Sequence, residues 1–185
     1  MLIDITLQVT PDMLGTAWEN TAKSLIGHLG THFDVMDKEF SLDYTQRKGV
    51  AFDVSHIRGR DVDIGDIDLD AVKADMFVAF HTNFIDEEEY GTPRYFKEHP
   101  QLSNELIEAL LDKRISMIGV DCAGIRRGKE HVLADRKCAD RGAFVVENLC
   151  NLNALPFRGT PFTVRTYPMN IAGITGLPCR VVAEI

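Results

Sequence analysis

Two histidines and an aspartate stand at even spacing in IGHLGTHFDVMDK, the segment from residue 26 to residue 38. They are His28, His32 and Asp34. Imidazole and carboxylate ligands together suit Zn²⁺, Mn²⁺ or Fe²⁺. Three protein ligands leave coordination positions open for water and substrate, as a catalytic site requires. The residue types therefore predict a metal site in this segment.

The backbone that would align these side chains is extended. In a helix, His28 and His32 would share a face but Asp34 would point away, and Gly27 and Gly30 disfavour a helix. In a strand, residues 28, 30, 32 and 34 project to one side, with Gly30 leaving room for an ion. The alternative is a strand whose histidines hydrogen-bond to neighbouring loops.

The elements that must position this segment are mostly strands. We expect strands at residues 1–9, 50–55, 76–80, 115–120, 143–146 and 179–185, where apolar runs or alternation recur. One helix follows Ser103, a candidate N-cap, and another runs from about Glu130 to Arg141 and stops at Gly142. The acidic segment 61–70 lacks the closing Glu of an EF-hand and is expected to form a strand edge or turn.

The composition limits the class of protein. A chain of 185 residues without repeats or linkers suits one α/β domain over residues 1–185. The formal net charge of -8 argues against nucleic acid or an anionic membrane as partner. No apolar run of about 20 residues suggests a membrane span, and no secretory signal is evident, so a cytoplasmic protein is expected. Four widely spaced cysteines are expected to be buried free thiols rather than disulfides.

Five segments carry a resemblance to a known family. HLGTHFD resembles the signature H-x-G-T-H-x-D-x-P-x-H of the metal-dependent cyclase/hydrolase family, which includes bacterial kynurenine formamidase and isatin hydrolase. The other segments are similar to later motifs of that family in the same order: FHTNF at 80–84, MIGVDCAGI at 117–125, VVENLCNLNALP at 145–156 and YPMNIAGITGLPCRVVAEI at 167–185.

The resemblance implies a fold, a set of ligands and a reaction. The fold would be of the swivelling β/β/α type, with mixed sheets and few helices, assembled as a homodimer or homotetramer. His28, His32 and Asp34 match the first metal ligands, and Glu147 matches a glutamate that holds metal and handles protons. The cofactor would be one or two divalent ions, Zn or Mn, and the substrate a small amide hydrolysed by metal-activated water.

The chain departs from the family pattern at Lys38, which stands where the pattern has its final histidine. That histidine is credited with acid/base catalysis. A protonated lysine would donate to a leaving amine or stabilise an oxyanion, but it would need a strongly lowered pKa to accept a proton. The alternative is that Lys38 points to solvent and this part of the catalytic machinery is missing.

A second departure lies twelve residues before Glu147, where many members carry a histidine ligand. Asp135 occupies that register, and His131 lies one helical turn earlier on the same face. We expect Asp135 to be the ligand, with His131 as the alternative. An aspartate there would favour a harder ion such as Mn over Zn, or would leave the second metal position weak.

The remaining histidines and aromatic residues offer weaker candidates. His81 is expected to line a substrate pocket if any of them does, whereas His56 and His99 are expected to be surface or loop residues. Trp18, Tyr95 and Phe96 are expected to pack rather than to bind an aromatic substrate.

The leading hypothesis is a metal-dependent hydrolase that cleaves a C–N bond of a small amide, cyclic or formyl, with Glu147 shuttling the proton and Lys38 stabilising charge. The rival is a catalytically degraded member that serves as a metal- or small-ligand-binding protein, which Lys38 and Asp135 would favour.

Overall fold

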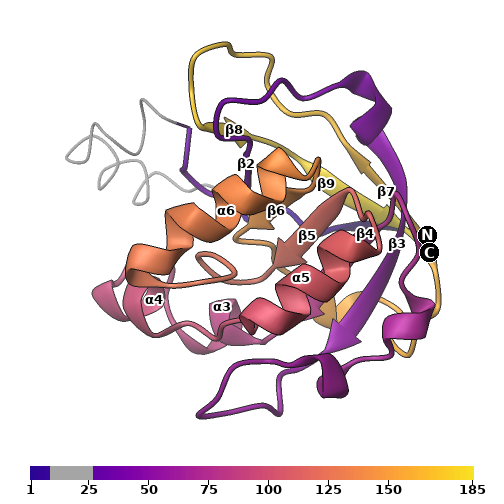
Figure 1. Cartoon of the computed structure of the whole chain (residues 1–185), viewed down its shortest axis with the longest axis vertical. Coiled ribbons are helices and arrows are strands. Elements are labelled where there is room, and N and C mark those ends of the chain that lie inside the picture. The colour runs from indigo at the N-terminus through magenta and orange to yellow at the C-terminus, as the bar shows by residue number, and fades with distance from the viewer. Residues whose placement is uncertain (9–26) are drawn as a thin grey trace.

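One mixed sheet organises the computed structural model, which describes residues 1–8 and 27–185 (Figure 1). The nine strands of this part lie in the order β1-β9-β7-β3-β4-β5-β6-β2-β8. Their bounds are β1 Leu2–Asp4, β2 His32–Asp34, β3 Gln46–Asp53, β4 Phe77–His81, β5 Met117–Val120, β6 Phe144–Glu147, β7 Phe162–Thr166, β8 Gly176–Pro178 and β9 Val181–Glu184. The α-helices are α3 Phe84–Glu87, α4 Pro93–Glu98, α5 Asn104–Asp112 and α6 His131–Asp140.

The centre of the sheet is parallel and its flanks are antiparallel. Strands β3, β4, β5 and β6 run parallel to their neighbours in this set, while β7, β9 and β1 on one side and β2 and β8 on the other pair antiparallel. Helix α5 leads into β5 and helix α6 leads into β6, as the sequence predicted. Because parallel strands require a crossover connection, these helices are placed against the sheet.

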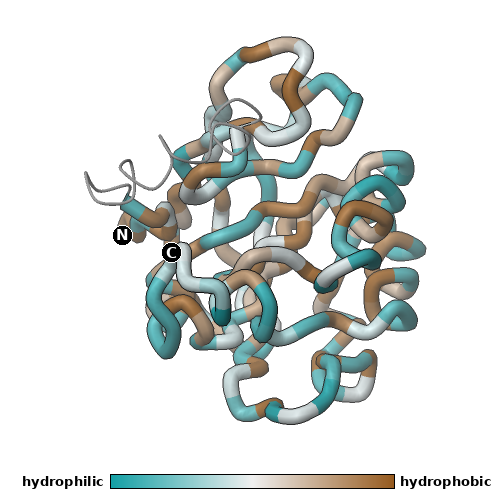
Figure 2. Tube along the Cα trace, turned by 90° about the vertical axis from the view of Figure 1, so that its left-hand side faces the viewer, coloured by the Kyte–Doolittle hydropathy of each residue, from teal (hydrophilic) through white to brown (hydrophobic). Residues whose placement is uncertain are grey.

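The two faces of the sheet bury separate cores. One core lies under the helices and includes Leu106 and Leu110 of α5 and Val145 of β6. The other combines Leu177 of β8 with Ala183 of β9, residues from opposite ends of the strand order. The sheet therefore curls around this second core. Figure 2 shows hydrophobic residues recurring along the inner part of the trace and hydrophilic stretches on many outer turns.

The predicted helix boundaries are confirmed. The Ser103 hydroxyl accepts a hydrogen bond from Leu106 N at 3.0 Å and so caps α5. Gly142, at φ +75°, follows the end of α6 in the left-handed conformation expected there.

The expected strands occur at slightly different bounds, and the N-terminal one is shorter than residues 1–9, whose last residue lies outside the described part. The acidic segment 61–70 forms two short 3₁₀ turns, Ile64–Asp66 and Leu69–Ala71, so the turn prediction is confirmed. All four cysteines are free thiols.

The fold class expected from the sequence is confirmed: α/β, with a mixed sheet and few helices. None of the described helices is long and apolar enough to cross a membrane.

Candidate metal centre

The segment that carries the first candidate ligands is only partly a strand. Strand β2 begins at His32 and ends at Asp34, and the residues before it form a turn. Gly27 and Gly30 adopt φ of +81° and +67°, values that divert the chain from an extended course. The prediction of one extended edge from His28 to Asp34 is therefore wrong for its first half. The turn nevertheless returns His28 to the face of β2.

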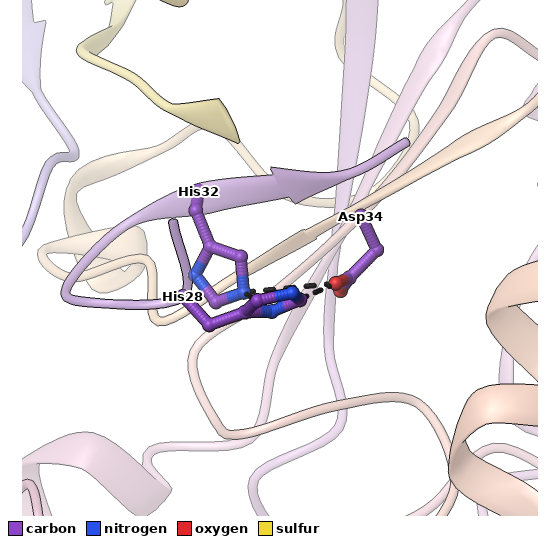
Figure 3. A group of neighbouring side chains, drawn as sticks. All are labelled: His28, His32 and Asp34. Carbon is purple, nitrogen blue, oxygen red and sulfur yellow. Dashed lines mark hydrogen bonds and ion pairs between the residues drawn. The ribbon is translucent and has the colours of Figure 1, made fainter. Parts of the chain in front are cut away.

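The side chains of His28, His32 and Asp34 converge (Figure 3). His28 Nδ1 lies 2.9 Å from His32 Nε2 and 3.1 Å from Asp34 Oδ1. His32 Nε2 lies 3.7 Å from the same Asp34 oxygen. One ligand atom from each residue lies within 4.8 Å of the others, so the three groups can surround a single cation.

A second group of three ligands comes from α6 and β6. His131 and Asp135 are one helical turn apart, with His131 Nε2 3.4 Å from Asp135 Oδ2. Glu147, at the end of β6, places Oε1 3.5 Å from the same His131 nitrogen. The structure thus brings Asp135 and His131, the two alternatives predicted for this register, close to Glu147. Which of the two binds a metal stays a prediction.

The two groups of ligands lie side by side because strands β2 and β6 are neighbours in the sheet. His32 of β2 lies directly opposite Glu147 of β6, and directly opposite residues on neighbouring strands project to the same face. His32 Nε2 is consequently 3.6 Å from Glu147 Oε2. Helix α6 packs on that face, where its buried Asp135 adds a third carboxylate. The six residues form one continuous site.

Each histidine uses one ring nitrogen outside the site and turns the other inward. His32 Nδ1 donates to the Gly30 carbonyl at 2.9 Å, and His131 Nδ1 donates to the Arg126 carbonyl at 3.1 Å. His28 Nε2 lies 3.0 Å from the Thr175 hydroxyl. Such outer hydrogen bonds fix the tautomer and ring orientation of metal-binding histidines.

The carboxylates fit a cation. Among the described residues, Asp34 and Asp135 form their ion pairs with histidines and not with Lys or Arg. Asp34 Oδ2 and Asp135 Oδ1 are buried without a hydrogen-bond partner. Burying a carboxylate in this way is costly unless a positive charge compensates it. The donor set of three imidazoles and three carboxylates therefore suits one or two divalent ions.

Two glycines make room for the ligands. A Cβ atom at Gly124 would lie 2.6 Å from the His131 ring and 3.0 Å from Glu147 Oε1, and one at Gly176 would lie 2.8 Å from the His28 ring. Any larger residue would displace these side chains. The sequence gives no local indication of this need, because the close approach joins distant segments.

Burial and mutual charge shift the pKa values of three of these groups in directions that a bound cation would compensate. Burial opposes ionisation of Asp34, but His32 and His28 outweigh it and lower the pKa of Asp34. Burial raises the pKa of Asp135 well above its ordinary value, and the charge of Asp34 adds to that rise. Burial also lowers the pKa of His32, which keeps its imidazole neutral and able to coordinate.

Lys38 makes its contacts at the surface. Its Nζ lies 2.7 Å from Asp140 Oδ1 and 3.4 Å from Asp37 Oδ1, and the side chain is 37% exposed. The hydrogen bond to Asp140 is the main reason that the pKa of Lys38 is raised. A raised pKa opposes any role as proton acceptor. These surface contacts agree with the alternative interpretation from the sequence, in which Lys38 points to solvent.

The remaining candidate histidines lie in other elements. His81 lies on the face of β4 that carries Phe77 and Ala79, opposite to the face used by Glu147, and its ring stacks on Phe157. His56 is an exposed loop residue, as expected. His99 also lies in a loop, but it is buried.

The predicted packing role of Tyr95 is confirmed, because its side chain is fully buried. Phe96 packs against Tyr95 at a ring distance of 5.5 Å. Trp18 lies outside the described residues. The pocket-lining role of His81 stays a prediction.

Sequence reasoning missed residues that support the site from behind. Tyr90 accepts a hydrogen bond from Gly30 N at 2.9 Å, and the amide of Asn148 donates to the Gly30 carbonyl at 2.9 Å. The only indication of Asn148 in the sequence is its position directly after Glu147. Nothing in the sequence indicates Tyr90, because its contact with Gly30 depends on the tertiary fold.

Comparisons with known proteins also indicate a metal-dependent hydrolase fold. The Cyclase family model, described as "Putative cyclase", matches residues 3–126. A solved "potential metal-dependent hydrolase with cyclase activity" is 21% identical at a TM-score of 0.75, covering 99% of this chain and 96% of that one.

Two further solved structures share the fold. Isatin hydrolase A from Labrenzia aggregata, bound to benzyl benzoate, is 20% identical at a TM-score of 0.71, covering 84% of this chain and 72% of that one. A "predicted metal-dependent hydrolase" from Bacillus stearothermophilus is 18% identical at a TM-score of 0.70, covering 99% of this chain and 97% of that one. No curated protein matches.

Proposed function

Since this chain belongs to the Cyclase family, we propose that it is a metal-dependent hydrolase that cleaves a C–N bond of a small amide. The observation that carries the proposal is the continuous site of three imidazoles and three buried carboxylates. The names of the similar structures, a metal-dependent hydrolase and isatin hydrolases, support a hydrolase and favour a cyclic amide as substrate. A formyl amide is the alternative that the sequence resemblance suggests.

The ligand set divides between two positions. His28, His32 and Asp34 would hold one divalent ion, and His131, Asp135 and Glu147 would hold a second or assist the first. A divalent ion bound there supplies a Lewis acid and lowers the pKa of coordinated water. We propose Mn or Zn, with the three carboxylates favouring the harder ion.

The chain's own residues orient the reaction and move the proton. Hydrolysis adds the oxygen of water to the amide carbonyl carbon, breaks the C–N bond and transfers a proton to the leaving nitrogen. We assign that transfer to Glu147; the assignment is supported by the position of its two oxygens, which face His32 and His131 from the end of β6. The surface ion pairs of Lys38 favour leaving it out of the proton transfer.

The first test is elemental analysis of the purified, dialysed protein beside a His28→Ala, His32→Ala double variant. We expect near-stoichiometric Mn or Zn in the wild-type protein and at least one ion fewer in the double variant. His56→Ala is the matched control, because it removes an exposed imidazole outside the site. Absence of metal in the wild-type protein, even after reconstitution with excess Mn²⁺ or Zn²⁺, would overturn the proposal.

The second test is hydrolysis of isatin and of an N-formyl aromatic amine, followed by absorbance. We expect Glu147→Gln to reduce kcat/KM by about 100-fold or more, as the loss of a general acid/base does. Lys38→Gln should keep kcat/KM within about threefold of the wild-type value, because exposed ion pairs contribute little energy. Full activity in the double histidine variant would contradict the mechanism.

The rival function is a metal- or ligand-binding protein without catalysis. The observation that favours it is the absence of the family's final histidine at Lys38. Metal binding at stoichiometric level, combined with no hydrolysis across a panel of linear and cyclic amides, would support this rival. The homodimer or homotetramer expected from the resemblance stays a prediction that light scattering tests.

A further inference from the structure

Asn148 connects the end of β6 to the turn that precedes β2. It is buried and adopts φ +57°, a left-handed conformation that asparagine tolerates. Its Nδ2 donates to the Gly30 carbonyl at 2.9 Å, and its own carbonyl accepts from the Thr31 hydroxyl at 2.7 Å. Asn148 thus holds two consecutive residues of the turn through one side chain and one backbone group.

The Gly30 carbonyl that Asn148 holds is also the acceptor for His32. His32 Nδ1 donates to this oxygen at 2.9 Å, so two donors share one carbonyl. The second bond leaves His32 Nε2 unprotonated and directed at Asp34 and Glu147. The position of one carbonyl oxygen therefore sets the direction in which His32 presents its ligand atom.

Tyr95 fixes the orientation of the Asn148 amide. The Tyr95 hydroxyl donates to Asn148 Oδ1 at 2.9 Å, which leaves the amide nitrogen to face Gly30. Tyr95 belongs to α4, where it is fully buried and packs against the ring of Tyr90 at 5.3 Å. Tyr90 in turn accepts from Gly30 N, so both polar groups of the Gly30 residue are anchored to one aromatic cluster.

We infer that Asn148, oriented by Tyr95, is a positioning residue of the metal centre. It acts through the Gly30 carbonyl on the tautomer and direction of His32, without binding the ion itself. The inference rests on the proposed metal site. Partners of this kind behind a ligand raise metal affinity by about 10- to 100-fold.

The test compares Asn148→Asp with a matched control. Asp has the same shape and tolerates the same backbone conformation, but it cannot donate to Gly30 O. Asn151 is the control because it also adopts a left-handed φ of +54° and donates its Nδ2 to a backbone carbonyl, Asp4 O, at 3.0 Å. Asn151→Asp therefore removes the same type of bond in the same loop, away from the ligands.

The measurements are the Kd for Zn²⁺ by competition with a chromophoric chelator, and the visible spectrum of the Co²⁺-loaded full chain. We expect Asn148→Asp to raise the Kd by 10- to 100-fold and to shift the Co²⁺ bands. Asn151→Asp should keep the Kd within about twofold of the wild-type value and leave the Co²⁺ spectrum unchanged. Tyr95→Phe, which removes only the hydroxyl, should give a smaller loss in the same direction and remains usable if Asn148→Asp fails to fold.

The outcomes separate this inference from the proposed function. Metal binding in the wild-type protein with an unchanged Kd and Co²⁺ spectrum in both Asn148→Asp and Tyr95→Phe would overturn the positioning role and leave the hydrolase proposal standing. Equal losses in Asn148→Asp and Asn151→Asp would also overturn it, because they would reflect general destabilisation. No metal binding by the wild-type protein would overturn both.

Discussion

Gly124 lies where the chain after β5 passes beside His131 and Glu147. Its φ of +122° and the 2.6 Å approach of a Cβ atom to the His131 ring leave space for hydrogen alone. Gly124→Ala should cost about 1–3 kcal/mol of stability through backbone strain. It should also displace His131 and weaken metal binding, measured as the Kd for Mn²⁺.

Gly128→Ala provides the control for this prediction. Gly128 also has a positive φ, +59°, but a Cβ atom there meets nothing within 4 Å. The variant should lose some stability and keep the wild-type metal affinity. A Gly124→Ala protein that binds Mn²⁺ as tightly as the Gly128→Ala protein would contradict the crowding argument.

His99 links stability to pH. Burial lowers its pKa to about 4 from an ordinary value of 6.5, so the unfolded chain binds a proton more readily than the folded one. The free energy of unfolding therefore has the full contribution of neutral His99 above pH 6.5. As the pH falls toward 4, this free energy decreases by at most about 3 kcal/mol. We expect urea denaturation with chelator present to show this loss.

His99→Asn should flatten that part of the pH profile. Asn retains a side-chain amide in place of Nδ1, which hydrogen-bonds to the Pro100 carbonyl at 2.9 Å. His56→Asn, at an exposed site, controls for the loss of one imidazole. If the wild-type and His99→Asn proteins lose stability equally between pH 7 and pH 4.5, His99 is not the group responsible.

At the scale of elements, one hydroxyl joins α5 to the acidic turn. The Ser103 hydroxyl caps α5 through Leu106 N and donates to Asp63 Oδ1 at 2.9 Å, while Asp63 caps the turn Ile64–Asp66. Ser103→Ala should therefore lower the free energy of unfolding by about 1–2 kcal/mol, toward the upper end for a cap. Urea denaturation measures the change.

The matched control for this cap is Ser41→Ala. Ser41 caps the short 3₁₀ segment Leu42–Thr45 at an exposed position. Its loss should cost less than about 0.5 kcal/mol, as for most surface changes. Equal costs for the two variants would argue that the bond to Asp63 contributes nothing.

At the scale of the whole molecule, the candidate metal centre joins segments that are distant in sequence. The turn at His28, strand β2, helix α6 and the end of β6 contribute its ligands. A cation bound only by the folded chain at 100 times its Kd stabilises it by about 2.7 kcal/mol. For a chain of this size that corresponds to a rise in Tm of about 5–10 °C.

Differential scanning fluorimetry in EDTA and in excess Mn²⁺ or Zn²⁺ measures this rise. The His28→Ala, His32→Ala double variant should show a clearly smaller metal-dependent shift in Tm, whereas His56→Ala should shift as the wild-type protein does. A rise of the same size in the double variant would mean that the metal binds elsewhere.

The local patterns of the chain predicted the class of fold and one of the two ligand groups, the one formed by His28, His32 and Asp34. Apolar runs and the cap at Ser103 predicted the helices and strands, because these depend on neighbours within a few residues. The close spacing of His28, His32 and Asp34 predicted their convergence. The strand proposed for all three was wrong because the positive φ of Gly27 and Gly30 is a property of the folded turn.

The sequence by itself determined which residue types were available as ligands and that α-helices would alternate with an apolar sheet. Only the tertiary structure decided that His131 and Asp135 both reach Glu147, that Lys38 pairs with Asp140, and that Asn148 supports His32. The physical reason is that these contacts follow from the β2–β6 register and from the packing of α6. The register brings together residues more than 100 positions apart, such as His32 and Glu147, and no local pattern encodes it.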